Sequence, residues 1–138
     1  MIKGYTTGVY DLFHIGHLNI LRRAKEMCDY LIVGVSTDEL VMEYKGKAPI
    51  IPYEERYAII EAIKYVDEVV PQKNRDKVEA YYRLKFDVMF HGDDWKGSNL
   101  FNEVEIIFAD KGVEIVYFPY TKGTSSTLLT EVLQMSLK

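Results

Sequence analysis

Hydrophobic stretches alternate with segments of helical pattern along the whole chain. Five short runs are rich in β-branched and aromatic residues, and most are nearly continuous in apolar side chains, as expected for strands buried on both faces. These predicted strands are 2–9, 30–36, 68–70, 88–91 and 113–118. In most of the segments that follow them, apolar residues recur at spacings of three and four, which is typical of amphipathic helices. The predicted helices are 17–27, 52–63, 76–84, 100–111 and 126–137.

This alternation predicts the α/β class, with a five-stranded parallel sheet and helices on both faces. The chain has 138 residues, and no linker or repeat divides it, so we expect a single domain over residues 1–138. Ligands of such sheets bind beyond the carboxyl ends of the strands. Four polar loops are expected at that edge, and the sequence therefore predicts one site there. The loops are 7–17, 36–38, 91–95 and 119–127.

Composition and charge narrow the possible functions. Hydrophobic residues make up 48% of the chain and charged residues 28%, which is ordinary for a globular protein. Seventeen basic against 21 acidic residues give a net charge of −4, which argues against broad binding of nucleic acid phosphates. Cys28 is the single cysteine, so an internal disulfide and a cysteine-based zinc site are excluded. Without a long apolar run or a signal peptide pattern, we expect a cytoplasmic protein that does not enter membranes.

Two of the three histidines lie in His14-Ile15-Gly16-His17, where the first predicted strand leads into the first helix. Gly16 lets a ligand approach the backbone, the helix N-terminus offers N–H groups and a positive dipole end, and imidazole N–H groups donate to phosphate oxygens. The motif therefore predicts an anion clamp. Two alternatives stay open: a helix cap or packing role, and metal ligation with Asp93 or Asp94 as a further ligand. The glycine-rich phosphate-binding loops of other nucleotide-binding proteins are missing from the sequence.

Two further segments are candidates for phosphate binding. Lys47 lies in the basic stretch 44–49 after the second strand, where it either reaches over a bound phosphate chain or is a solvated loop lysine. The hydroxyl-rich run 120–127 leads into the last helix. Its hydroxyls, together with Lys122, either hold a triphosphate from the side opposite the histidines or cap the helix.

A pair of basic residues marks the helix predicted at 52–63. Arg56 and Lys64 are eight residues apart, so on a helix they lie roughly 80° apart around the axis and near enough to share a face with Ile60. We expect that face to look toward a bound nucleotide.

Taken together and in this order, the motifs resemble those of the small cytidylyltransferases. The resemblance rests on segments 8–17, 56–67, 92–95 and 123–127 and spans nearly the whole chain. Class I aminoacyl-tRNA synthetases share the histidine motif, but 138 residues leave no room for a tRNA-binding domain. The resemblance implies a Rossmann-like fold, a homodimer, and a Mg²⁺-dependent reaction in which CTP and a phosphorylated alcohol give a CDP-alcohol and pyrophosphate.

The resemblance also implies roles for individual residues. His14, His17 and Lys47 are expected to be catalytic and to stabilise the reacting phosphates. The residues expected to bind the nucleotide are Gly8, Val9, Tyr10, Gly16, Arg56, Lys64, Asp93, Tyr120, Thr121, Ser125, Ser126 and Thr127. Those expected to bind the acceptor are Asp11, Asp38, Arg75 and Asp94. We expect no metal site in the protein itself, because Mg²⁺ arrives with CTP.

The sequence departs from the family pattern at three of these positions. Tyr120 and Lys64 each stand where the family has an arginine, and Arg75 stands where members that use glycerol phosphate have a tryptophan. A guanidinium pairs well with phosphate, whereas the cationic heads of choline or ethanolamine phosphate need an aromatic or acidic cage. The overall resemblance favours glycerol 3-phosphate as the acceptor, and the charge of Arg75 agrees with it; the alternative is a solvated Arg75 that merely precedes a helix.

The expected reaction needs no general base, because a phosphate monoester is mostly dianionic at pH 7. Its demands are in-line alignment of two anions and stabilisation of the charge that develops as pyrophosphate leaves, for which we expect positive groups from His14, His17 and Lys47. Other functions remain open: transfer of a cytidylyl or adenylyl group to another phosphorylated alcohol, and nucleotide sensing without turnover.

Overall fold

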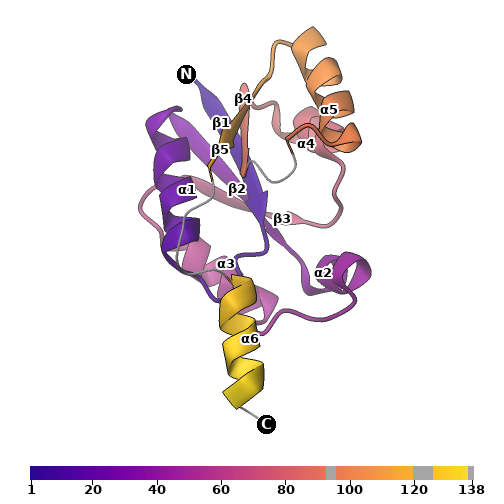
Figure 1. The fold of residues 1–138 in the computed structure, drawn as a ribbon. Coiled ribbons are helices and arrows are strands. Elements are labelled where there is room, and N and C mark those ends of the chain that lie inside the picture. Colours follow the sequence, from indigo (N-terminus) through magenta and orange to yellow (C-terminus); the bar gives the residue numbers. More distant parts are fainter. Residues whose placement is uncertain (93–95, 120–125, 137–138) are drawn as a thin grey trace.

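The fold is a three-layer α/β arrangement around one parallel sheet (Figure 1). The structure, a computed structural model, describes residues 1–92, 96–119 and 126–136. The strands are β1 (Lys3–Gly8), β2 (Tyr30–Ser36), β3 (Glu68–Gln72), β4 (Val88–Gly92) and β5 (Glu114–Phe118). They form a single sheet in the order β3-β2-β1-β4-β5, and every neighbouring pair is parallel. The predicted class and the five-stranded parallel sheet are confirmed.

The helices of the described part of the chain connect these strands. They are α1 (Ile15–Glu26), α2 (Asp38–Lys45), α3 (Tyr53–Glu61), α4 (Lys77–Leu84), α5 (Asn99–Asp110) and α6 (Ser126–Ser136). Helices α1 and α3 cover one face of the sheet, and α4 and α5 cover the other (Figure 1). None of the helices in the described ranges has the length and apolar character needed to cross a membrane.

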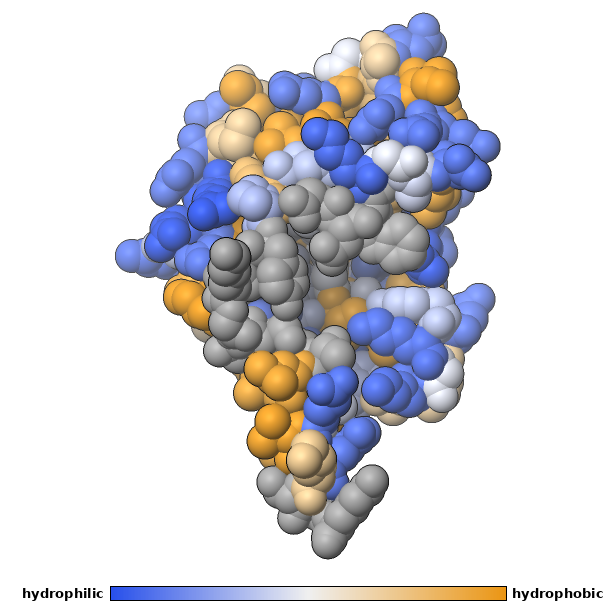
Figure 2. Space-filling view, in the orientation of Figure 1, coloured by the Kyte–Doolittle hydropathy of each residue, from blue (hydrophilic) through white to orange (hydrophobic). Residues whose placement is uncertain are grey.

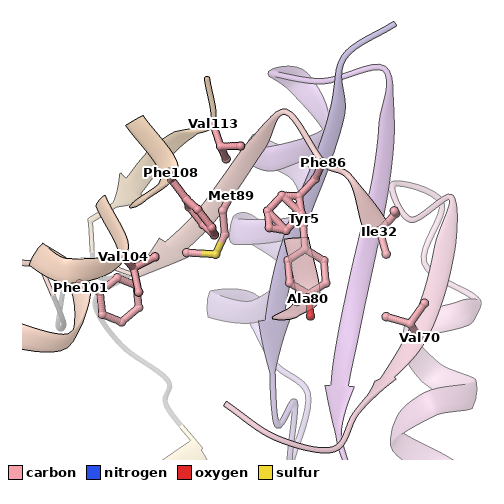
Figure 3. Close-up of a cluster of buried hydrophobic side chains, with 10 residues drawn as sticks. All are labelled: Tyr5, Ile32, Val70, Ala80, Phe86, Met89, Phe101, Val104, Phe108 and Val113. Atoms are coloured by element: carbon pink, nitrogen blue, oxygen red, sulfur yellow. The ribbon is translucent and has the colours of Figure 1, made fainter. Parts of the chain in front are cut away.

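Strand residues alternate between two buried hydrophobic clusters, one on each face of the sheet. Tyr5, Ile32 and Met89 pack with residues of α4 and α5, as Figure 3 shows. Leu31 and Phe90 point the other way and pack with residues of α1 and α3. Burial on both faces explains why the strands appear in the sequence as nearly continuous apolar runs.

Helix α2 was not among the predicted elements. Thr37 caps its N-terminus, because the Thr37 hydroxyl accepts a hydrogen bond from the Leu40 N–H, and Gly46 ends it with a positive φ of 73°. Only Leu40 and Val41 are buried, so the apolar pattern is too short to reveal a helix. The basic stretch predicted as a loop at 44–49 therefore begins inside the last turn of α2.

Candidate active site

A cavity of about 520 Å³ lies at the carboxyl edge of the sheet, where the sequence predicts a site. It is bounded by the ends of β1 and β4, by α1, α2 and α6, and by the loop after α2. The lining residues are Thr6, Thr7, Gly8, Val9, Tyr10, Asp11, His17, Ile20, Val41, Lys45, Lys47, Ala48, Pro49, Ile50, His91, Gly92, Thr130, Glu131 and Gln134. Gly8, Val9 and Tyr10, expected to bind the nucleotide, are thus at the cavity.

The loop between β1 and α1 is held in an unusual backbone conformation. Tyr10 and Leu12 both have positive φ values, 57° and 51°, in the left-handed region that costs a residue with a side chain about 1 kcal/mol or more. A Cβ at Gly8 would lie 2.9 Å from the Tyr10 ring, so a larger residue there would displace the ring. The buried Tyr10 ring meets the edge of the His17 imidazole at a centroid distance of 5.4 Å. The loop thereby fixes the position of His17.

The two motif histidines form a hydrogen-bonded pair at the start of α1. The Gly16 N–H donates to Nδ1 of His14 at 3.0 Å, and the His14 N–H donates to Nδ1 of His17 at 3.2 Å. The ring centroids are 4.0 Å apart. Because both Nδ1 atoms accept, each neutral imidazole carries its hydrogen on Nε2. The pair therefore offers two Nε2–H donors to a ligand. The helix-cap alternative and the anion-clamp prediction are compatible, because the Nδ1 atoms accept from the backbone and the Nε2–H groups remain for an anion.

The histidines are neutral at pH 7 in this structure. Burial and, to a smaller extent, the neighbouring His14 lower the pKa of His17 to about 4. Burial also lowers the pKa of His14. The expectation that this pair supplies positive charge is therefore wrong for the protein without ligand: the pair supplies hydrogen-bond donors. The Gly16 N–H is likewise engaged by His14 rather than open to a ligand.

Asp11 anchors the segment that carries Lys47. Its two carboxylate oxygens accept hydrogen bonds from the N–H groups of Ile50 and Ile51, at 2.8 and 2.9 Å. Lys47 is exposed and lies at the cavity, as predicted. The structure thus gives Asp11, expected to bind the acceptor, a role in holding the loop at the cavity.

Arg56 does not face the cavity, although the sequence predicted a contact with the nucleotide. Its side chain is fully buried, and the guanidinium donates to the carbonyl oxygens of Val9, Ser36 and Ile51 at 2.7 to 2.8 Å. It also pairs with Asp38 at 2.7 Å. The other Asp38 oxygen accepts from the backbone N–H that begins α3. Arg56 and Asp38 therefore connect the ends of β1 and β2 with α2 and α3 below the site, and their charges meet each other instead of a ligand.

Lys64 is also placed differently from the prediction. Helix α3 ends at Glu61, so Lys64 lies beyond the helix and does not share a helical face with Arg56. Its ammonium lies 5.3 Å from the ring centroid of Tyr65 on the surface. The predicted spacing of Arg56 and Lys64 around a helix does not apply, because the apolar pattern in the sequence continues beyond the last turn of α3.

Arg75, expected to bind the acceptor, lies beside α2. Its guanidinium stands 4.7 Å from the ring centroid of Tyr44, in the last turn of that helix. Next to it, the Nζ of Lys77 donates to Oγ1 of the cavity residue Thr7 at 3.0 Å. Sequence analysis missed both Thr7 and Lys77. No local pattern marks them, because Lys77 becomes buried only when α4 packs on the sheet.

His91 is another cavity residue without a predicted role. It lies at the end of β4, its Nδ1 is 3.1 Å from the Gly92 carbonyl oxygen, and its ring centroid is 4.8 Å from that of Phe101. Helix α6 adds the polar residues Thr130 and Glu131 to the lining of the cavity. The predicted loop 91–95 thus reaches the cavity through its first two residues.

Several predicted site residues lie outside the described residues. They are Asp93, Asp94, Tyr120, Thr121, Ser125 and the side chains of Ser126 and Thr127. In the described ranges, no group of three or more His, Cys, Asp or Glu side chains could hold a metal ion. The metal alternative depends on Asp93 or Asp94 and stays a hypothesis.

Comparisons with known proteins agree with this geometry. Residues 5–133 match the family described as Cytidylyltransferase-like. The chain is 42% identical over 132 residues to the glycerol-3-phosphate cytidylyltransferase of Bacillus subtilis (strain 168), covering 95% of this chain and 96% of that protein. It is 38% identical over 120 residues to an FAD synthase of Pyrococcus abyssi (strain GE5 / Orsay), covering 86% and 81%. The crystal structure of the lipopolysaccharide core biosynthesis protein from Thermoplasma volcanium GSS1 is similar with a TM-score of 0.73 and 28% identity, covering 90% of this chain and 99% of that one.

Proposed function

The chain belongs to the cytidylyltransferase-like family, and on that premise we propose that it transfers the cytidylyl group of CTP to glycerol 3-phosphate. The products are CDP-glycerol and pyrophosphate. The observation that carries the proposal is the near-full-length similarity to the glycerol-3-phosphate cytidylyltransferase of Bacillus subtilis. The cavity supports it with hydrogen-bond donors and basic side chains at the expected edge of the sheet.

In the proposed reaction, a phosphate oxygen of the acceptor attacks the α-phosphorus of CTP. The bond from the α-phosphorus to the bridging oxygen breaks, and its electron pair leaves with pyrophosphate. The Nε2–H groups of His14 and His17 donate to phosphate oxygens as this charge develops, and the pair needs no reorganisation because the backbone already fixes both rings. Lys47 adds a positive charge from the anchored loop.

We propose that Mg²⁺ enters as part of the nucleotide substrate. The described carboxylates at the cavity are Asp11 and Glu131, and both oxygens of Asp11 accept backbone hydrogen bonds. A site of this kind favours a cation held mainly by triphosphate oxygens. We also propose, from the family resemblance, a cytoplasmic homodimer. Sedimentation equilibrium would test this assembly against the 16.0 kDa of one chain.

Adenylyl transfer is the second candidate function, favoured by the similarity to an FAD synthase. The histidine pair contacts phosphates and is indifferent to the base, so it fits either nucleotide. The deciding experiment incubates the protein with CTP or ATP, Mg²⁺ and glycerol 3-phosphate, phosphocholine or phosphoethanolamine, and measures pyrophosphate. We expect turnover with CTP and glycerol 3-phosphate. A preference for ATP or for phosphocholine overturns the proposal, and binding without turnover indicates a sensor.

A further inference from the structure

The imidazole of His17 is surrounded by other aromatic rings. The Tyr10 ring lies at a centroid distance of 5.4 Å and an interplanar angle of 70°, and the Phe13 ring stacks on the imidazole at 5.3 Å and 30°. The His14 ring lies at 4.0 Å. Because the His14 N–H holds Nδ1 of His17, Nε2–H is the part of the ring left for a ligand in the cavity.

The turn that carries Tyr10 and Phe13 has a backbone conformation that its residues do not favour. Tyr10 and Leu12 both have positive φ values, although large side chains are uncommon in this region. Glycine at either position would relieve the strain. Strained residues persist where the surrounding structure holds them, and they are concentrated at functional sites. The strain at Tyr10 therefore points to a function of its side chain.

Burial shows how the two rings act on a ligand. Tyr10 is 6% exposed, so nearly all of its surface contacts the protein. Phe13 is partly buried against the same hydrophobic cluster as Tyr10, and it lies outside the described lining of the cavity. The contact that both rings share is the His17 imidazole, which does line the cavity. Their effect on a ligand is therefore exerted through His17.

A fixed and neutral imidazole is what the proposed reaction needs from His17. Its Nε2–H must point at a phosphate oxygen as charge develops, and a ring free to rotate would have to be realigned in each turnover. The enclosing rings also keep water away, and burial is the largest cause that lowers the pKa of His17 to about 4. Of the titratable neighbours, His14 lowers this pKa and Asp11 raises it, each by less than burial does.

We propose that Tyr10 and Phe13 are positioning residues, whose rings hold the His17 imidazole with Nε2–H directed at the phosphates of the nucleotide. The inference rests on the proposed function and deepens it, because it assigns the alignment of one catalytic donor to two aromatic side chains. Tyr10, expected from the resemblance to bind the nucleotide, acts through His17. The left-handed turn is what brings both rings to the same imidazole.

The kinetic test compares variants that keep a ring with variants that remove one. Tyr10→Leu and Phe13→Leu each remove a ring, and Tyr10→Phe is the conservative variant that keeps it. We expect both leucine variants to lower kcat at least about tenfold, with KM for CTP within about threefold, because a misaligned donor loses much of its effect on the transition state. Tyr10→Phe should restore kcat to within about twofold of wild type. Wild-type kcat in both leucine variants, or an effect confined to KM for CTP, overturns the proposal.

Loss of a buried ring also lowers stability, so a variant at a second site controls for that effect. Phe108 is fully buried in the cluster on the other face of the sheet, which α4 and α5 cover (Figure 3). We expect Phe108→Leu to lower the melting temperature at least as much as Phe13→Leu does, and to keep the kcat of wild type. Equal losses of kcat in these two variants would reveal a general effect of stability and overturn the positioning role.

A titration of the imidazole tests the positioning role without any turnover. The His17 signal is followed by NMR between pH 8 and pH 5 without nucleotide, and His17→Asn assigns it. We expect the signal to stay near its neutral position in wild type and Tyr10→Phe, because the pKa is about 4. In Phe13→Leu water reaches the imidazole, so the signal should shift by pH 5 as the pKa moves toward the ordinary value of about 6.5.

The titration also separates this inference from the proposed function. A His17 signal that behaves alike in wild type and Phe13→Leu overturns the positioning role, whatever the kinetics show. A protein whose His17 titrates as expected, but which does not turn over CTP with glycerol 3-phosphate, overturns only the proposed function.

Discussion

At the scale of single residues, the histidine pair combines a helix cap with two ligand donors. His14 caps α1 through Nδ1, and Nε2–H is the atom left for phosphate. Alanine removes both functions, whereas asparagine caps helices well and lacks the imidazole donor. The two roles of His14 can therefore be separated.

We expect His14→Ala and His17→Ala each to lower kcat at least about a hundredfold, the usual scale for losing one preorganised donor. His14→Asn should lose kcat to a similar degree but keep the thermal stability of the wild type. Steady-state kinetics and thermal melts monitored by circular dichroism check both. Losses below tenfold in folded protein would make the pair structural.

The buried imidazole of His17 also predicts how stability depends on pH. Its pKa is about 4 in the folded protein and about 6.5 when unfolded, so protonation favours unfolding. The contribution of neutral His17 to the free energy of unfolding is complete above about pH 6.5 and is lost as the pH falls toward 4. By pH 5 the loss from His17 reaches about 2 kcal/mol. Urea unfolding at pH 7 and pH 5 should show a smaller loss in His17→Asn; an equal loss would contradict the assignment.

The histidine motif could be predicted from sequence because its chemistry is local: a glycine and two imidazoles at a helix start. Arg56 and Lys77 could not be placed this way. Arg56 donates to the carbonyl oxygens of Val9 and Ser36, which are distant along the chain, and Lys77 is buried only by tertiary packing. A basic residue in a sequence does not reveal whether its charge meets a ligand or the protein's own backbone.

At the scale of elements, Arg56 joins α3 to the ends of β1 and β2 and to α2. Removing it leaves buried carbonyl oxygens without donors and Asp38 without its partner. We expect Arg56→Met to lower the free energy of unfolding by about 3 kcal/mol or more. The matched control is Arg83→Met, which breaks an exposed ion pair with Glu79 and should cost under about 1 kcal/mol. Similar losses in urea unfolding would contradict the structural role.

The loop after α2 carries the next prediction at this scale. Asp11 holds its backbone at Ile50 and Ile51, and Lys47, in the same loop, lies at the cavity. We expect Lys47→Ala to lower kcat more than it raises KM for CTP, because an exposed loop lysine tightens on the charge of the transition state. A rise in KM with unchanged kcat would show uniform binding instead.

Helices α2 and α6 show the limits of pattern reading for short elements. Helix α2 has only two buried residues, so its pattern gave no prediction. Helix α6 was predicted, and Figure 2 shows hydrophobic residues gathered on it, in line with the exposed Leu128, Val132 and Leu133. Its polar residues Thr130 and Glu131 meet the cavity. The amphipathic pattern predicts the helix, but not which face meets the site.

At the scale of the whole molecule, the sheet could be predicted because burial on both faces leaves an unmistakable pattern in each strand. The position of the site followed from the parallel order, since all carboxyl ends meet at one edge. The contribution of α2 to the cavity could not be predicted, because only tertiary packing brings Val41 and Lys45 to that edge.

The hydrogen positions on the histidine pair have a stereochemical consequence. Because Nε2 of each ring carries a hydrogen, neither imidazole has a lone pair there to attack the α-phosphorus, and in the proposed reaction the acceptor oxygen attacks it directly, in line with the departing oxygen. A single displacement along that line inverts the configuration at phosphorus. CTP carrying a chiral α-thiophosphate should therefore give CDP-glycerol of inverted configuration, readable by ³¹P NMR, while retention would reveal a covalent intermediate on the protein.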